Sequence, residues 1–239
     1  MIRTHNLSKR YPDGTLALDA LEVEVPPGTI YCLLGGSGSG KTTAVRLMLG
    51  LVPPTAGRVE LAGQGAPQPG ASAVYLPSRF PFYDRLTALE NLALFAGLGG
   101  PAPGPEKLED ALRQVGLPER IFDRRVETLS PGQGQKLALA VALVRDVAIW
   151  ILDEPLLGLD PGSAHDLVEQ LIAARERRKA IFWATQDLIR AKQVADRVGI
   201  LDSGRLVSTY DRDELGYLDL EELYLGYSLG DQDASSSPY

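Results

Sequence analysis

The sequence predicts a mixed α/β fold with a parallel sheet at its centre. Short apolar runs alternate with helical patterns along the chain, which is typical of strands joined by helical crossovers. Three runs, Ile30–Leu34, Val147–Leu152 and Ala180–Thr185, are almost entirely apolar, as strands buried on both faces of a parallel sheet are. Of the 239 residues, 44% are hydrophobic and 23% charged, which is ordinary for a globular chain.

The remaining elements follow from shorter patterns. Further strands are expected at Leu21–Val25, Gly57–Leu61, Ala73–Leu76, Val198–Leu201 and Leu206–Ser208. Helices are expected at Lys41–Leu51, Glu106–Val115, Pro131–Arg145, Ser163–Arg178 and Leu188–Ala195. Gly50 and the prolines that follow it stop the first helix, and Asp187 is suited to cap the last one.

Residues 80–128 lack β-branched runs and predict helices around a loop at Gly97–Pro105. We therefore expect an α/β core at 1–79 and 129–210, interrupted by a helical insert at 80–128. A helical extension is expected at 211–230, with Asp219–Tyr224 as an amphipathic helix. The tail 231–239 is small and polar, so we expect it to be disordered.

Charge and composition exclude several classes of protein. The net charge of −7 argues against a surface that coats nucleic acid, because such a surface needs clustered lysines and arginines. The single cysteine, Cys32, excludes an intrachain disulfide and fits a reducing compartment. No apolar run approaches the length of about 20 residues that a membrane span needs, and the first residues lack the apolar core of a secretory signal. We expect a soluble chain whose membrane role, if any, comes through a partner.

The segment Gly35–Thr42 (GGSGSGKT) matches the phosphate-loop pattern G-x-x-x-x-G-K-[ST]. It follows an apolar strand and opens a helix, which is the context in which the pattern is credible. The glycines let backbone N–H groups turn toward phosphate oxygens, and the helix adds the positive end of its dipole. Lys41 should reach the β- and γ-phosphates, and Thr42 should ligate Mg²⁺.

Two acidic residues suited to binding Mg²⁺ and polarising water follow the strand Val147–Leu152. Asp153 and Glu154 come directly after it, at the carboxyl edge where parallel sheets bind ligands. Asp153 is suited to hold Mg²⁺ through water, and Glu154 to polarise an attacking water.

Together with these motifs, Leu129–Gln133 (LSPGQ) resembles the LSGGQ signature of ATP-binding cassette (ABC) proteins, the motor subunits of ABC transporters. The order of motifs is similar too: an aromatic residue, the phosphate loop, the signature, the acidic strand end and then Gly158–Asp160. The resemblance covers about residues 2–210. It implies a P-loop NTPase fold of the ABC type, with a small antiparallel β region and an inserted helical subdomain.

The resemblance also implies a role for each matching residue. Tyr11 stands where the family has an aromatic that stacks on adenine; a tyrosine packed in the core is the alternative. Ser130, Gly132 and Gln133 would contact the γ-phosphate bound by an opposite protomer, and Leu157–Asp160 resembles the loop linking the two sites. ATP would be cradled by Gly35, Gly36, Ser37, Gly38, Ser39, Gly40, Lys41, Thr42 and Thr43, with Asp160 supplied across the dimer.

Two positions depart from the family pattern. Ser78 replaces a glutamine that helps bind Mg²⁺, and serine has a shorter reach. Gln186 replaces a histidine that holds the γ-phosphate and the water, and glutamine does not titrate. The chain is therefore expected to be either an active ATPase, with Lys41, Glu154 and Gln186 as its catalytic set, or a slow, regulatory half of a heterodimer.

The expected partners are a second cassette, because each ATP site needs two chains, and a membrane permease docking near 78–91. The segment around Phe80, Phe82 and Tyr83 resembles that of drug-, lipid- and polysaccharide-type exporters, so export is favoured over import; a local aromatic core is the alternative interpretation of the three rings. The expected location is the cytoplasmic face of the membrane. A non-transport ABC ATPase is a further alternative, although Lys41 and Ser130 are separated by no coiled-coil run.

Overall fold

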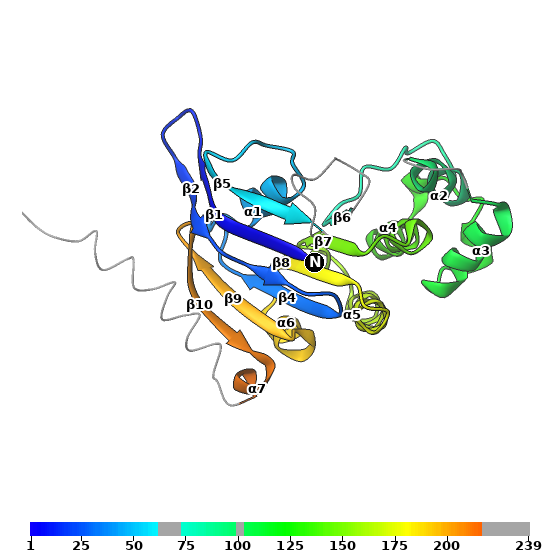
Figure 1. The fold of residues 1–239 in the computed structure, drawn as a ribbon. Helices are drawn as coiled ribbons and strands as arrows, with labels where there is room; N and C mark the ends of the chain where they lie inside the picture. Colours follow the sequence, from blue (N-terminus) through cyan, green and yellow to red (C-terminus); the bar gives the residue numbers. More distant parts are fainter. Residues whose placement is uncertain (62–72, 99–102, 217–239) are drawn as a thin grey trace, which may run out of the picture.

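The larger of two sheets forms the centre of the protein. The structure is a computed structural model that describes residues 1–61, 73–98 and 103–216. The six strands of this sheet run in the order β10-β9-β4-β8-β7-β6 (Figure 1). They are β4 (Thr29–Leu34), β6 (Ala73–Pro77), β7 (Ile149–Asp153), β8 (Ala180–Thr185), β9 (Arg197–Asp202) and β10 (Arg205–Asp211). All neighbours pair in parallel except β10 and β9, which confirms the expected parallel core.

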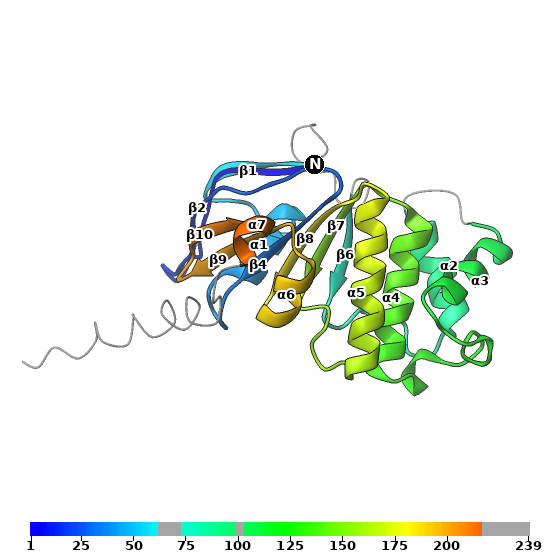
Figure 2. The same ribbon diagram turned by 90° about the horizontal axis from the view of Figure 1, so that it is seen from below.

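A smaller antiparallel sheet lies beside this core (Figure 2). Its strands are β1 (Ile2–Arg10), β2 (Leu16–Leu21), β3 (Glu24–Val25) and β5 (Ala56–Leu61). β1 pairs with each of the other three. The polar sequence of β1 has no apolar run, so its strand was not predicted from the sequence.

The expected strand Leu21–Val25 is wrong as a single element. β2 ends at Leu21, and the pairing resumes only at Glu24. Between them the Thr4 hydroxyl donates to the Leu21 carbonyl at 2.9 Å and accepts from the Val23 N–H at 2.8 Å. A buried side chain therefore takes the place of a ladder partner at this point.

Seven α-helices are described: α1 (Lys41–Met48), α2 (Ala88–Gly97), α3 (Pro105–Gln114), α4 (Pro131–Arg145), α5 (Pro161–Glu176), α6 (Leu188–Val194) and α7 (Arg212–Leu215), with the 3₁₀ turns η1 (Glu119–Ile121) and η2 (Val126–Thr128). The prediction for α4 is confirmed in full. α1 stops at Met48 rather than Leu51, because Gly50 adopts a φ of 68° and its N–H bonds the Leu47 carbonyl. α5 begins at Pro161 rather than Ser163, because Asp160 caps it.

Successive residues of the central strands point alternately into two apolar layers, one on each face of the sheet. On β4, Ile30, Cys32 and Leu34 belong to the layer that includes α4, α5 and α6, while Tyr31 and Leu33 belong to the layer that includes α1 and the small sheet. Figure 2 shows α4 and α5 side by side over one face of the sheet. Trp150 and Trp183 are buried. The two apolar layers cover both faces of the sheet. They therefore hold in place the strand ends from which the loops at the carboxyl edge begin.

The helices α2 and α3 lie on the far side of α4 from the sheet (Figure 1). They share the apolar layer of α4, through residues such as Leu92, Leu108 and Leu112. Part of the expected loop at Gly97–Pro105, the expected helix at Asp219–Tyr224 and the tail 231–239 fall outside the described residues.

Candidate functional site

The phosphate loop joins the end of β4 to the start of α1, and two of its glycines have no room for a side chain. A Cβ at Gly35 would lie 2.4 Å from Ser39 Oγ and 2.5 Å from the Leu201 carbonyl oxygen. A Cβ at Gly40, where φ is 108°, would lie 2.4 Å from the Ala17 carbonyl oxygen. The loop path therefore requires glycine at both positions.

Lys41 is the first residue of α1, and its side chain folds back over the loop. Its Nζ donates to the carbonyls of Gly35 at 2.6 Å and Gly36 at 2.8 Å, and lies 3.7 Å from Glu154 Oε1. Burial lowers the pKa of Lys41, while Glu154 and Asp153 oppose that shift. The ammonium is thus held at the mouth of the loop by two backbone carbonyls and lies near the Glu154 carboxylate.

The two acids at the end of β7 lie against the same loop. Thr42 Oγ1 donates to Asp153 Oδ1 at 3.3 Å. Burial raises the pKa of Asp153, and the Thr42 hydroxyl and Lys41 counteract the rise. Two oxygen donors, the Thr42 hydroxyl and the Asp153 carboxylate, therefore meet beside the loop, and Mg²⁺ prefers such ligands together with substrate phosphates and waters.

Glu154 is fixed by the neighbouring strand β8. Its backbone has a φ of 50°, and its N–H bonds the Ala184 carbonyl at 2.9 Å. Its Oε2 accepts from the Thr185 hydroxyl at 3.3 Å and from the Gln186 N–H at 3.1 Å. Strained backbone of this kind persists where surrounding contacts hold it, often at functional sites. The carboxylate is held with Oε1 directed toward Lys41.

The loop has the properties of a phosphate cradle. Ser39 Oγ is buried and has no hydrogen-bond partner among the described residues, while Ser37 and Gly38 are exposed. An unpaired buried hydroxyl beside an ammonium and a helix N-terminus suits an anionic ligand. No cluster of three or more His, Cys, Asp or Glu side chains with the geometry of a metal site occurs in the described part of the chain.

Tyr11 lies at the outer edge of this site. Its hydroxyl is 3.4 Å from Thr43 Oγ1, so it contacts the helix that the loop opens. The side chain is half-buried rather than part of either apolar layer. Tyr11 therefore lies outside both apolar layers, and its role stays a prediction.

The signature residues lie at the start of α4, where Ser130 and Gln133 form a capping box. The Gln133 N–H donates to Ser130 Oγ at 3.3 Å, and the Ser130 N–H to Gln133 Oε1 at 3.0 Å. Ser130 is exposed. No hydrogen bond or ion pair joins these residues to the phosphate loop within the described ranges.

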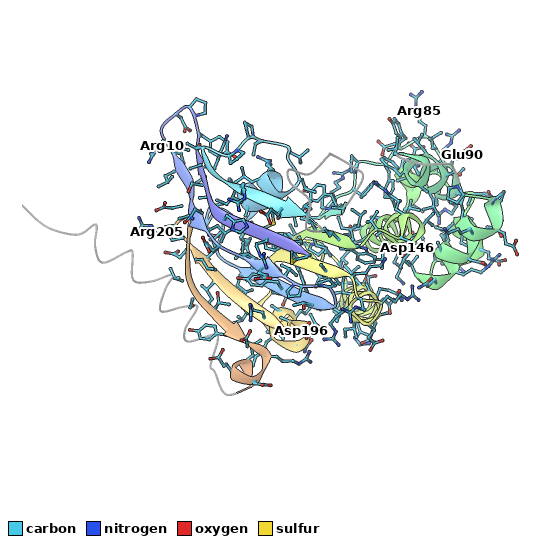
Figure 3. The ribbon with its side chains drawn as sticks, in the orientation of Figure 1. Arg10, Arg85, Glu90, Asp146, Asp196 and Arg205 are labelled. Atoms are coloured by element: carbon cyan, nitrogen blue, oxygen red, sulfur yellow. The ribbon has the colours of Figure 1, made fainter. Side chains whose placement is uncertain are left out.

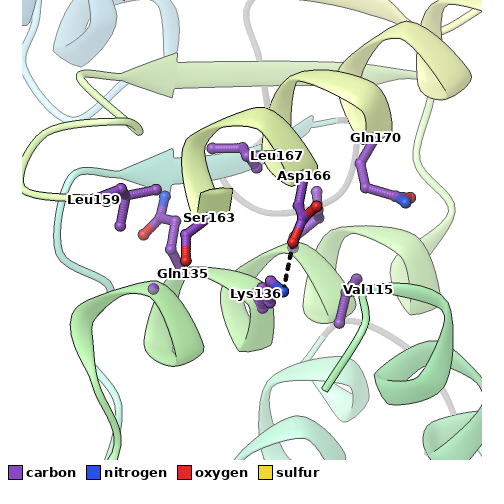
Figure 4. Close-up of a pocket in the computed structure, with 10 residues that line it drawn as sticks. Val115, Gln135, Lys136, Leu159, Ser163, Asp166, Leu167 and Gln170 are labelled. Carbon is purple, nitrogen blue, oxygen red and sulfur yellow. Dashed lines mark ion pairs between the residues drawn. The ribbon is translucent and has the colours of Figure 1, made fainter. Parts of the chain in front are cut away.

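Helix α5 fits tightly against this start of α4. Asp160 caps α5 by accepting from the Ser163 N–H at 3.0 Å and its hydroxyl at 2.7 Å. A Cβ at Gly132 would lie 2.4 Å from Ser163 Oγ. Further along, Lys136 reaches from α4 to Asp166 on α5, with Nζ and Oδ2 2.8 Å apart (Figure 4). The start of α4 and the start of α5 therefore form one interlocked unit.

The two atypical positions differ in their surroundings. Gln186 has an exposed side chain, and its N–H holds Glu154. Ser78 follows Pro77, which pairs with Asp153 in the sheet, but it is exposed and lines a hollow of about 560 Å³. That hollow is also lined by Phe80, Phe82, Leu129 and Gly158.

The three rings of this segment have different surroundings. Phe80 and Phe82 stack at 4.5 Å between centroids and meet Phe95 edge-on, so they form a local aromatic cluster. Tyr83 is 58% exposed.

Two polar residues that hold this region were missed from the sequence. Gln135, buried in α4, donates to the Pro77 carbonyl at 3.2 Å. Asn91, also buried, accepts from the Tyr83 N–H at 2.8 Å and donates to the carbonyls of Tyr83, Leu86 and Thr87. For Asn91 the available signal was an amide within the largely apolar pattern of α2, whereas Gln135 lies in the polar start of α4 and gave no such signal.

This fold and this loop define a P-loop nucleotide-binding protein. A family model described as ABC transporter matches residues 18–157. The chain belongs to the ABC transporter family, as an ATP-binding subunit.

Similar proteins agree with this assignment. The Nod factor export ATP-binding protein I of Burkholderia orbicola (strain AU 1054) is 35% identical over 208 residues, covering 85% of this chain and 68% of that protein. The bacitracin transport ATP-binding protein BcrA of Bacillus licheniformis is 34% identical over 240 residues, covering 97% and 76%.

Solved structures have the same fold. An ATP-binding subunit of an ABC transporter superposes with a TM-score of 0.85 at 27% identity, covering 95% of this chain and 99% of that one. A dimeric cassette in a post-hydrolysis state, bound to ADP and Pi, gives 0.81 at 25% identity, covering 89% and 99%. Among the described helices, none has both the length and the apolar character of a membrane span.

Proposed function

We propose that this chain hydrolyses ATP between two cassettes and thereby drives a separate membrane subunit, in an export system. The observation that carries the proposal is the meeting of Lys41, Thr42, Asp153 and Glu154 at one end of the phosphate loop. These are a phosphate-binding cation, two metal-binding oxygens and a carboxylate base, which phosphoryl transfer to water requires.

In the proposed mechanism, Lys41 exchanges its Gly35 and Gly36 carbonyl partners for β- and γ-phosphate oxygens. Thr42 and Asp153 would hold Mg²⁺, which supplies charge neutralisation on the phosphates when bound. Glu154, held by Thr185 and the Gln186 backbone, accepts a proton from the attacking water. Tyr11 offers its ring to adenine.

The second half of each site is proposed to come from another cassette. Ser130, Gly132 and Gln133 are separate from the phosphate loop in this chain, and Ser130 is exposed at a helix N-terminus that suits an anion. Leu157, close to Asp160, is 68% exposed. Both features fit an interface that forms around nucleotide, with Asp160 contributing from the partner.

The permease is proposed to dock in the hollow beside Ser78, within 78–91. Phe80 and Phe82 give the hollow part of an apolar lining, beside charged residues such as Arg79 and Asp84. Tyr83, in the same segment, supplies an exposed aromatic, as interface anchors do. The names of the relatives, Nod factor export and bacitracin transport, favour an exporter. The cytoplasmic face of the membrane is the location that follows. We also propose that the chain is divided into an α/β core, a helical insert at 80–128 and a C-terminal extension at 211–230.

A second candidate is a slow, regulatory cassette paired with a faster one. Gln186 favours it, because this exposed amide cannot titrate as a histidine does. Ser78 also favours it, because the serine hydroxyl reaches less far than the glutamine that stands here in the family pattern. The appearance of ADP and phosphate, measured with and without the membrane subunit, separates an active subunit from a regulatory one.

The decisive test measures binding and turnover of ATP by the full chain in its membrane complex. Glu154→Gln is expected to retain ATP binding and to lower turnover by about 10²–10⁴-fold. Glu176→Gln, the same change at an exposed position on α5, is the matched control. Lys41→Ala should weaken ATP binding, and Ser130→Arg should abolish ATP-dependent dimerisation. Normal turnover in Glu154→Gln would overturn the proposal.

A further inference from the structure

The ring of Tyr11 is held from two directions. Lys9 Nζ lies over the ring, 5.4 Å from its centroid. At the far end of the ring, the hydroxyl lies 3.4 Å from Thr43 Oγ1 on α1. One face of the ring is therefore occupied by a cation. A flat ligand would have to stack on the opposite face.

Lys9 is itself tied in place. Its Nζ donates to the Pro53 carbonyl at 2.6 Å, and the side chain is half-buried. The neighbouring Arg10 is exposed at the outer end of the small sheet (Figure 3) and bonds the Gly14 carbonyl instead. Of these two cations, Lys9 is the one fixed over the Tyr11 ring.

We propose that Lys9 is a positioning residue for the nucleotide base, acting through Tyr11. This inference rests on the proposed role of Tyr11 as the adenine platform. A cation over one face of an aromatic ring is attracted by its negative quadrupole and draws electron density toward itself. The opposite face then repels the π-system of a stacked base less, and the ring is held in the orientation that stacking requires. The ligand class is an aromatic nucleoside phosphate.

The test compares a ligand that carries a base with one that does not. Dissociation constants of the full chain for Mg²⁺–ADP and Mg²⁺–pyrophosphate are measured by calorimetry. Lys9→Met is expected to weaken ADP binding about two- to fivefold and to leave pyrophosphate binding unchanged. Lys9→Arg should restore ADP binding, because a guanidinium also stacks on aromatic faces. Arg58→Met, which removes an exposed cation from the same sheet, is the control.

The same measurement in a Tyr11→Ala background separates this inference from the proposed function. If Lys9 acts through the ring, Lys9→Met adds no further loss once the ring is gone. Equal losses for ADP and pyrophosphate, or a loss that persists without Tyr11, would overturn the inference in favour of a direct or structural effect of Lys9. Unchanged ADP affinity in Tyr11→Ala alone would instead overturn the adenine platform on which it rests.

Discussion

The carboxylate of Glu154 is held by the backbone of Gln186, not by its side chain: the Gln186 N–H donates to Glu154 Oε2 at 3.1 Å. The Gln186 amide group itself is exposed. Substitution of this side chain therefore leaves the support of the carboxylate intact.

The first prediction follows from that contact. Gln186→His is expected to raise the single-turnover rate of ATP hydrolysis in the assembled complex, because the imidazole adds a titratable group near a carboxylate that stays in place. Nucleotide affinity should change little. Gln186→Ala serves as the control for loss of the side chain alone. An unchanged rate in Gln186→His would contradict the view that Gln186 slows this site.

A second prediction concerns the two glycines of α4. Gly132→Ala is expected to destabilise the chain by about 1–3 kcal/mol, because the new Cβ meets Ser163 Oγ at 2.4 Å. Gly134→Ala, two residues on, has nothing within 4 Å and should stabilise the helix by about 0.5–1 kcal/mol. Denaturant unfolding measures both. Ser163→Gly should relieve the defect of Gly132→Ala, and failure of that rescue would refute the interlock.

A third prediction concerns alkaline pH. Burial raises the pKa of Tyr31 to about 12, from 10.0. Burial disfavours the phenolate of Tyr31 in the folded state and not in the unfolded state. The contribution of Tyr31 to the unfolding free energy is therefore complete below pH 10 and is lost as the pH rises through about 12. The loss is about 3 kcal/mol at about 1.4 kcal/mol per unit. Tyr31→Phe should remove this part of the pH dependence of the unfolding free energy, whereas Tyr83→Phe, at an exposed ring, should retain it.

A fourth prediction concerns the loop that carries Tyr83. Asn91→Ala removes four hydrogen bonds to the backbone at Tyr83, Leu86 and Thr87 and leaves buried polar groups without partners. We expect a loss of about 2–4 kcal/mol in unfolding free energy and weaker co-purification with the membrane subunit. Glu169→Ala, at an exposed position on α5, should change neither. Full co-purification by Asn91→Ala would show that this loop does not present the docking surface.

The parallel core was predictable because its strands are apolar on both faces, as Ile30–Leu34 and Ala180–Thr185 are. The phosphate loop was predictable because its spacing is tied to one backbone path. β1 was not, because its formation depends on pairing with β2, β3 and the more distant β5 and not on its own polar residues. The break after Leu21 was hidden for a similar reason, since a distant Thr4 side chain takes the backbone bonds there.

At the candidate site, residue types were predictable but their contacts were not. Thr42 and Asp153 are 111 positions apart in sequence and meet through one hydrogen bond. The sequence showed Gln186 as a departure, but only the fold shows that its N–H supports Glu154. Asn91 and Gln135 were missed because a buried amide has no pattern of its own.

The contact between α4 and α5 couples the positions of their N-terminal ends. With Ser163 seated against Gly132 and Lys136 bound to Asp166, α5 cannot tilt without carrying the serine tip of α4 along. A displacement of the loop before α5 would therefore reach the start of α4 directly, through Ser163 and Lys136.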